Sequence, residues 1–475
     1  MNITRVVLLA FAVSLSMSAV AAEPAQTAAD LKAREIYAKI ISIPSELGNA
    51  KVPAVAEYLA GEFRAAGFPA DDIHIVPFKG DGDQTASLVV RYRSKDGGGK
   101  GKGGKPIVVM AHMDVVAAKR EDWERDPYTL VEENGYFFGR GTFDDKQGVA
   151  ALSATFIRLK GEKFVPKRDL IIYFSGDEET AQGSTADVAH NHRELIDAEF
   201  ALNADAGVGP LDDNGKALFF SYQTAEKTYA DFTLTARNPG GHSSLPRPDN
   251  AIYELADALV KVRAYKFPVM WNDTTVAFFK GSGLAHKDAL GAALSKYAAN
   301  PGDADAVSVI EKEPSMVGSL RTTCVATMLS GGHAENALPQ RATANVNCRI
   351  FPGVKPDDVL ATLQGVVGKD IDVKYKGTPQ YSDASPLRAD VDQAVSRAVH
   401  KIHPGIPVFP FQEPGATDGL VFRSIGIPTY GVDANFMPPK ETFTHGLNER
   451  LLVKSFYDSL TFWHALLTDL AGDRR

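Results

Sequence analysis

The sequence predicts an α/β protein in which a mainly parallel central sheet is flanked by helices and interrupted by a smaller inserted α+β domain. Two apolar runs, residues 106–111 and 170–174, are typical of strands buried on both faces. Segments with helical periodicity alternate with these runs, which is the pattern of a parallel sheet with helical crossovers. A chain of 475 residues with 44% hydrophobic and 23% charged residues is long enough for two or three globular domains.

The two ends of the chain supply the α/β elements. Near the N-terminus we predict helices over residues 27–42, 52–66 and 148–159, a helix-like segment over 190–195, and strands over 86–92, 106–111, 170–174 and 200–203. The first helix stops before Pro44 and the second closes at Gly67. The same pattern returns after residue 390, with a helix over 391–400, a strand over 429–432 and a closing helix over 451–470.

The middle of the chain has a different pattern. There we predict strands over 228–236 and 371–375, a hairpin of 322–330 with 341–350, and helices over 251–262 and 356–367. Two strand–helix–strand halves of this kind indicate a small open-faced α+β sandwich. An extra segment of mixed character spans residues 267–319. We therefore expect one discontinuous domain over 23–225 and 380–475, with an inserted domain over 226–379.

The net charge limits which partners are expected, and the N-terminal segment indicates the compartment. A net charge of -8 argues against nucleic acid or an anionic membrane surface as the main partner. Residues 1–22 have a basic start, an apolar stretch over 6–17 and a small-residue end, as a signal peptide requires. The apolar stretch is shorter than the roughly 20 residues of a spanning helix. We expect an exported protein, periplasmic or secreted, with no membrane span in the mature chain.

The two cysteines, Cys324 and Cys348, fall opposite each other if the predicted hairpin forms. An oxidising compartment permits a disulfide at this position. Two reduced, buried cysteines fit the sequence equally well, so the pairing stays open at this stage.

Polar residues follow each strongly predicted strand of the first domain. Asp177, Glu178 and Glu179 come directly after the strand over 170–174. Carboxylates at the end of a buried strand are costly unless a cation neutralises them. Other candidate ligands follow the remaining strands or precede a helix, namely His112, Asp114, Asp144, Asp145, Asn203 and Asp205. Because the carboxyl ends of parallel strands converge on one crevice, the sequence predicts a metal site there.

The ordered motifs resemble those of a known enzyme family. They are HMD at 112–114, GRGTFDDK at 139–146, GDEE at 176–179, NADAG at 203–207, GGHSS at 240–244 and THG at 444–446. Together they resemble the co-catalytic zinc exopeptidases, which include carnosinase, glutamate carboxypeptidase, carboxypeptidase S, aminoacylase and succinyl-diaminopimelate desuccinylase. The resemblance implies a zinc-peptidase-like catalytic domain and a ferredoxin-like lid or dimerisation domain.

The resemblance also implies a metal centre and a catalytic set. It places two Zn²⁺ ions, or Mn²⁺ or Co²⁺ in their place, on a bridging Asp144 that is followed by a cis peptide bond. His112 and Asp205 match ligands of one ion, while Glu179 and His445 match ligands of the other. Asp114 matches the residue that orients His112. Further matches are Glu178 as the general base, His242 in the lid as the oxyanion donor, and Asn336 and Arg349 as the clamp for a substrate carboxylate.

The expected activity is hydrolysis of a terminal peptide bond, of the carboxypeptidase or dipeptidase type, by metal-activated water. The sequence leaves two alternatives open: an N-acyl amino acid amidohydrolase, and a non-catalytic relative that binds peptides. The expected ligand is a small peptide or N-acyl amino acid. The resemblance also leaves two assemblies open. One is a homodimer formed through the lid, and the other is a monomer whose enlarged segment 267–319 imitates the second subunit.

Overall fold

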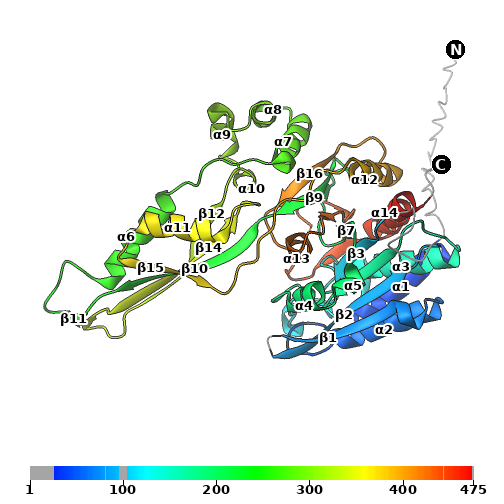
Figure 1. Cartoon of the computed structure of the whole chain (residues 1–475), viewed down its shortest axis with the longest axis horizontal. Coiled ribbons are helices and arrows are strands. Elements are labelled where there is room, and N and C mark those ends of the chain that lie inside the picture. Colours follow the sequence, from blue (N-terminus) through cyan, green and yellow to red (C-terminus); the bar gives the residue numbers. More distant parts are fainter. Residues whose placement is uncertain (1–25, 81, 96–103, 442, 473–475) are drawn as a thin grey trace, which may run out of the picture.

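The computed structural model describes residues 26–80, 82–95, 104–441 and 443–472. Its two largest sheets lie in separate bodies of the molecule (Figure 1). The predicted signal peptide over 1–22 lies outside the described residues. No helix among the described residues is long and apolar enough to cross a membrane.

The larger sheet has eight strands and is mainly parallel. Its order is β1 (Ile73–Gly80), β2 (Asp83–Tyr92), β6 (Leu170–Ser175), β3 (Ile107–His112), β7 (Phe200–Asn203), β17 (Thr429–Gly431), β9 (Phe220–Glu226) and β16 (Val408–Glu413). The central pairs β6/β3, β3/β7 and β7/β17 are parallel, whereas β1 and β2 run antiparallel at one edge. The α/β class predicted from the sequence is confirmed.

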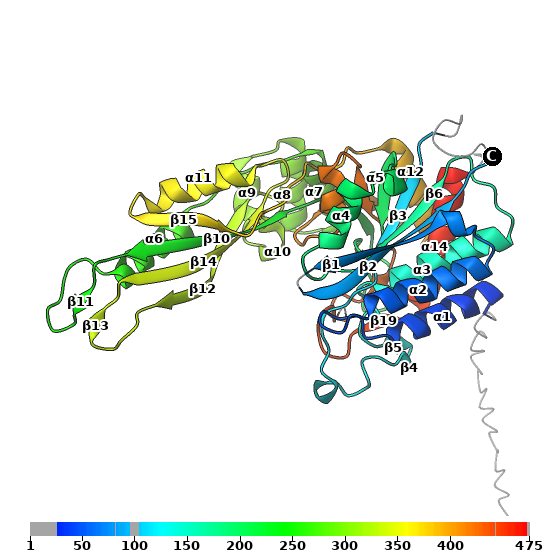
Figure 2. The ribbon, with the colours of Figure 1, turned by 60° about the horizontal axis from the view of Figure 1, so that its bottom comes forward.

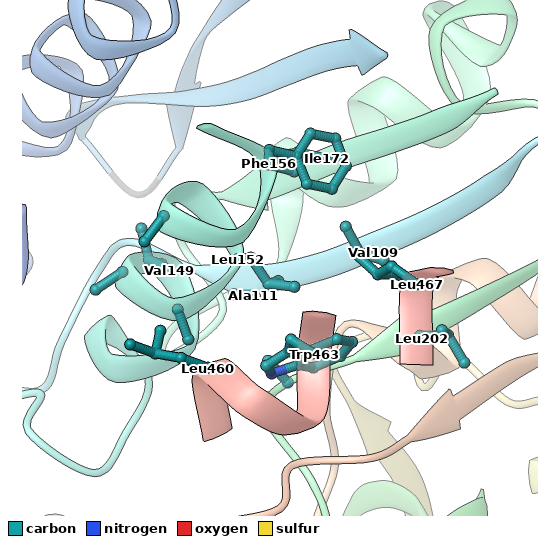
Figure 3. Packing of buried hydrophobic residues seen from close by; sticks show 14 of the residues in the cluster. Val109, Ala111, Val149, Leu152, Phe156, Ile172, Leu202, Leu460, Trp463 and Leu467 are labelled. Atoms are coloured by element: carbon teal, nitrogen blue, oxygen red, sulfur yellow. The ribbon is translucent and has the colours of Figure 1, made fainter. Parts of the chain in front are cut away.

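Helices cover both faces of this sheet because successive side chains of the central strands point to opposite sides. One face carries α1 (Ala28–Ile41), α2 (Val52–Ala65), α3 (Lys146–Gly161), α12 (Ala389–Ile402) and α14 (Val453–Ala471). The other carries α4 (Gly183–Asn191), α5 (Arg193–Ile196) and α13 (Gly419–Ser424). Val109 packs with Trp463 on the first face, as Figure 3 shows, whereas Val108 belongs to the cluster on the second.

The smaller sheet is antiparallel, with the order β12 (Thr323–Gly331), β14 (Arg341–Ile350), β10 (Thr228–Arg237) and β15 (Ile371–Lys376). Helices α6 (Ala251–Ala264) and α11 (Pro356–Val367) pack on it around a separate apolar core. The chain order strand–helix–strand–strand–helix–strand is that of a ferredoxin-like sandwich. At the end farthest from the larger sheet, β11 (Gly241–His242) pairs with β13 (Ala337–Leu338) (Figures 1 and 2).

The segment of mixed character is helical. It contains α7 (Asp273–Ala285), α8 (Ala289–Ala299), α9 (Ala304–Ile310) and α10 (Pro314–Val317), which share a small core of their own. Helix α7 packs against the edge strand β16 of the larger sheet, where the rings of Phe278 and Phe409 lie 6.2 Å apart. The hydroxyl groups of Thr224 and Thr274 meet at 2.6 Å. Segment 267–319 therefore packs against the edge of the larger sheet.

Several short elements escape sequence prediction. They are β4 (Val131–Glu133), β5 (Tyr136–Phe138), β8 (Gly209–Pro210), β18 (Phe436–Met437) and β19 (Arg450–Leu452). The helix-like segment over 190–195 is in fact the end of α4 and the start of α5, broken at His192.

Cys324 and Cys348 form a disulfide that joins β12 to β14. The two residues lie directly opposite each other in the strand register, as the predicted hairpin requires. The question left open by the sequence is thus answered in favour of the bond, which ties the edge strand β12 to the residue preceding Arg349.

Candidate metal centre

Loops at the carboxyl ends of three neighbouring strands meet above the larger sheet. His112 ends β3, Glu178 and Glu179 follow β6, and Asp205 follows β7. Asp144 lies in the loop before α3. These residues come together because parallel strands place their carboxyl ends at one edge of a sheet.

The carboxylate of Asp144 lies between two imidazole rings. Its Oδ1 is 2.8 Å from Nε2 of His112, and its Oδ2 is 3.1 Å from Nε2 of His445. His445 Nε2 also lies 2.9 Å from Oε1 of Glu179, and His112 Nε2 lies 3.6 Å from Oδ1 of Asp205. A carboxylate with one oxygen toward each histidine can bridge two cations. The peptide bond between Asp144 and Asp145 is cis, as the resemblance predicts.

The donor set fits metal ions. Ligand atoms of His112, Asp144 and Glu179 lie within 4.8 Å of one another, and so do those of His112, Asp145 and Asp205. Imidazole nitrogens with carboxylate oxygens suit zinc as well as other divalent first-row metals. The sequence offers Asp145 as a candidate ligand, but the resemblance assigns it no ligand role. Its fully buried carboxylate accepts a hydrogen bond from the backbone N–H of His112 at 3.3 Å.

The electrostatics of the cluster also favour a cation. Burial, with the negative charge of Asp144 and Glu179 against the opposing charge of His112, raises the pKa of Asp205 to about 7. Burial and the charge of Asp205 raise the pKa of Glu178 well above its usual range. Hydrogen bonds to Asp144 and Glu179 raise the pKa of His445 to about 10. A cation among these groups would stabilise the ionised carboxylates and the neutral imidazoles.

Asp114 positions two parts of the site at once. Nδ1 of His112 lies 3.0 Å from the backbone carbonyl of Asp114 and 3.5 Å from its carboxylate, so the carbonyl is the nearer acceptor. The carboxylate accepts hydrogen bonds from the backbone N–H groups of Glu178 at 3.1 Å and Glu179 at 3.0 Å. Asp114 therefore fixes the turn that carries both glutamates, which the sequence did not reveal.

The acidic triplet contains residues with different environments. Asp177 accepts hydrogen bonds from the backbone N–H of Ser184 at 3.1 and 3.0 Å, and so caps the start of α4. Glu178 accepts one from Nε2 of Gln182 at 3.0 Å. Gln182 has a left-handed backbone, with φ of 53°, immediately before α4. That conformation aims its side chain back at Glu178.

We expect Gln182→Gly to lower kcat by roughly 10-fold, because a hydrogen bond to a charged group contributes on the order of 1.5–3 kcal/mol. Glycine tolerates the left-handed backbone, so only the side chain is lost. Metal content and thermal stability should stay unchanged. Steady-state kinetics and metal analysis measure these effects. An unchanged kcat would show that the hydrogen bond from Gln182 does not support the action of Glu178.

A buried ion pair joins the loop of Asp144 to the loop of His445. Glu449 accepts hydrogen bonds from Nη1 of Arg140 at 2.6 Å and from the backbone N–H groups of Phe143 at 2.7 Å and Asp144 at 3.0 Å. The guanidinium of Arg140 also reaches the backbone carbonyl of His445 at 3.4 Å. Both side chains are almost fully buried. Neither residue stood out in the sequence, because a role of this kind depends on contacts between distant segments.

Arg349 lies near the candidate metal ligands, whereas Asn336 and His242 do not. A cleft of about 660 Å³ is lined by Glu178, Glu179, His445 and Arg349. The Arg349 guanidinium lies 4.7 Å from the centre of the Tyr229 ring.

His242 and Asn336 lie together at the tip formed by β11 and β13, where the backbone N–H of Ser243 donates to the carbonyl of Asn336 at 3.0 Å. Figures 1 and 2 place this tip at the end of the molecule opposite the larger sheet. Within one chain in this arrangement, the tip and the candidate metal ligands are apart.

Known proteins are similar to this chain in sequence and in fold. The chain is 27% identical over 382 residues to the N-fatty-acyl-amino acid synthase/hydrolase PM20D1 of Homo sapiens, which covers 78% of this chain and 75% of that protein. It is 25% identical over 384 residues to the probable carboxypeptidase S-like 2 of Dictyostelium discoideum, with 76% and 71% covered. The solved structure of the M20 family metallo-carboxypeptidase Sso-CP2 from Sulfolobus solfataricus matches with a TM-score of 0.64 and 17% identity, covering 92% of this chain and 99% of that one.

The sequence profile of Peptidase family M20/M25/M40 matches residues 108–469, which is well over half of the chain. The match includes the loops that carry all five candidate metal ligands. The chain therefore belongs to Peptidase family M20/M25/M40 and is a hydrolase of peptide or amide bonds.

Proposed function

We propose that this protein is a two-metal exopeptidase of the carboxypeptidase or dipeptidase type, which cleaves an amide bond next to a free carboxylate. The observation that carries the proposal is the position of Asp144 between His112 and His445, with Glu178 and Arg349 lining the adjoining cleft. The site thus combines a cation-binding cluster, a base and a carboxylate-binding cation.

In the proposed site, His112 and Asp205 would hold one zinc ion, Glu179 and His445 the other, and Asp144 would bridge them. Zinc held there would supply Lewis acidity, which polarises a carbonyl group and lowers the pKa of water. Asp114 would hold His112 through its backbone carbonyl, and its carboxylate would hold the turn of Glu178 and Glu179.

Glu178 would act as the proton shuttle. Its carboxylate takes a proton from the attacking water as the new C–O bond forms at the scissile carbonyl. It then gives that proton to the amide nitrogen as the C–N bond breaks, so that an acid and a free amine leave. Gln182 holds the carboxylate in place through the hydrogen bond that its Nε2 donates at 3.0 Å. Glu179 cannot do this work while its oxygens bind a cation.

We expect Arg349→Ala to raise KM by roughly 10- to 100-fold for substrates with a free carboxylate, since a charged hydrogen bond contributes on the order of 1.5–3 kcal/mol. Amidated substrates should be unaffected. Lys376→Ala is the matched control, because Lys376 is another cation that lines the same cleft. Equal effects of the two variants, or an equal effect on amidated substrates, would refute the clamp.

Hydrolysis of N-acyl amino acids is the second candidate. It is favoured by the similarity to N-fatty-acyl-amino acid synthase/hydrolases in several vertebrates. Both candidates cleave an amide whose amine side is an amino acid with a free carboxylate. A product-resolved hydrolysis screen across dipeptides, longer peptides and N-acyl amino acids separates them. Release of only N-terminal residues would contradict both.

We also propose that His242 serves the site of a second copy of the chain. Its side chain is exposed at the tip of the inserted domain, away from the candidate metal ligands of its own chain. A histidine there could donate a hydrogen bond to the oxyanion in a partner's site, and Asn336 beside it could contact the substrate carboxylate. Mixing inactive His242→Ala with inactive Glu178→Gln tests this. Recovery of activity requires a shared site, and sedimentation reports the assembly.

Export and metal identity complete the proposal. The signal-like residues 1–22 and the disulfide between Cys324 and Cys348 both support an oxidising compartment outside the cytoplasm. Metal analysis of protein purified without added metal distinguishes zinc from manganese or cobalt.

A further inference from the structure

A second pocket is lined by residues that lie next to candidate metal ligands in the sequence. Its volume is about 320 Å³, and its walls include Phe143, Val208, Met437 and Thr444. Phe143 directly precedes Asp144, and Thr444 directly precedes His445. Val208 follows Asp205 by three residues. Segments that carry three of the proposed ligands therefore also build this pocket.

The chemistry of the pocket differs from that of the cleft with Arg349. Phe143, Val208, Pro210 and Met437 give it apolar walls, and no Asp, Glu, Lys or Arg is among the described residues that line it. The other cleft is lined by acidic and basic side chains. An ionised group in the apolar pocket would lose hydration without gaining a charged partner, whereas an aliphatic group gains free energy on burial.

Asn435 and Thr444 are the polar residues of the described wall, and Asn435 is only 4% exposed. Its Nδ2 donates to Oδ2 of Asp433 at 2.9 Å, which fixes the orientation of the amide. Its Oδ1 has no hydrogen-bond partner among the described residues. A buried acceptor without a partner is unfavourable, but this oxygen is closed off from the pocket and offers a ligand no hydrogen bond.

We infer that this pocket binds the apolar part of the acyl group of the substrate, on the side of the scissile carbonyl opposite the amino acid carboxylate. The inference rests on the proposed function for the direction of the amide. The apolar group could be an aliphatic acyl chain or the side chain of an aminoacyl residue.

Val208 is the residue that tests this pocket most cleanly. Its backbone pairs with Ser221 through two hydrogen bonds of 2.9 Å, while its side chain is 40% exposed. Val208→Asp therefore changes the wall and leaves the backbone contacts in place. Val165→Asp is the matched control, because Val165 is 59% exposed and lines neither the pocket nor the cleft.

The experiment measures kcat/KM of the metal-loaded enzyme for one amino acid acylated with acetyl, butanoyl, hexanoyl and octanoyl groups. We expect kcat/KM to rise by about fourfold for each methylene that enters the pocket. Val208→Asp should abolish the rise with acyl-chain length, whereas Val165→Asp should keep it. A parallel set of dipeptides with glycine, alanine, valine and leucine at the N-terminal position distinguishes the aminoacyl source.

A binding measurement separates this inference from the proposed function. Calorimetry with straight-chain carboxylic acids of the same lengths reports the pocket without any turnover. Affinity that rises with chain length in the wild type and in Val165→Asp, but not in Val208→Asp, supports the pocket even if no amide is hydrolysed. Affinity that is independent of chain length, or equal losses in the two variants, would overturn it.

Discussion

Glu178→Gln is expected to lower kcat by roughly 10³-fold, within the range for loss of a general base. The amide of glutamine has nearly the shape of the carboxylate, and Gln182 remains beside it, but it cannot take a proton from water. Because Glu178 is not a proposed metal ligand, metal content should equal that of the wild type. The measurement pairs steady-state kinetics with metal analysis of the same preparation.

Glu179→Gln is the matched control, since it makes the same chemical change at the adjacent residue. Glu179 lies 2.9 Å from His445, so its replacement should lower metal retention first and activity as a consequence. Excess metal should then restore part of the activity of Glu179→Gln and none of that of Glu178→Gln. Unchanged hydrolysis by Glu178→Gln would contradict the assignment of Glu178 as the proton shuttle.

Glu449→Ala is expected to lower the free energy of unfolding by about 3–5 kcal/mol, because it leaves the buried guanidinium of Arg140 without its anionic partner. It also removes the acceptor that holds the backbone N–H groups of Phe143 and Asp144. We expect metal affinity to fall by about 10- to 100-fold, as is usual when a group that positions ligands is lost. Urea unfolding and metal titration measure the two effects separately.

Glu132→Ala provides the comparison for Glu449→Ala. Glu132 pairs with Arg34 at 2.9 Å, but both side chains are 44% exposed, so this change should cost no more than about 1 kcal/mol. The double variant Arg140→Met, Glu449→Leu should recover stability without recovering metal affinity. Equal stability losses for Glu449→Ala and Glu132→Ala would contradict the account of the buried pair.

The sequence was sufficient to predict the elements whose signal is local. The apolar runs that became β3 and β6 are buried on both faces, and the amphipathic segments became α1, α2, α6 and α11. The loops of His112 and of Glu178 and Glu179 were found because they follow those strands in sequence, whereas His445 was assigned only through the resemblance. The cysteine pair was correctly placed by the hairpin register, although its oxidation state was not predictable.

What the sequence did not reveal depends on contacts between distant segments. Edge strand β1 has a mixed burial pattern and Pro77 within it, so its signal was weak. Glu449 and Arg140 are ordinary charged residues until folding brings together positions that are far apart in the chain. The orientation of Asp114 toward the glutamate turn and of Gln182 toward Glu178 likewise depends on loop geometry. No periodic pattern in the sequence predicts that segment 267–319 packs against β16.

The central claim is that metal ions held by His112, Asp144, Glu179, Asp205 and His445 are required for amide hydrolysis. The most direct test removes metal with a chelator and titrates zinc back while the released amino acid is measured. The account predicts no hydrolysis without metal and full activity at two equivalents, with Asp144→Asn unable to retain them. Full activity in metal-free protein, or unchanged metal content in Asp144→Asn, would contradict it.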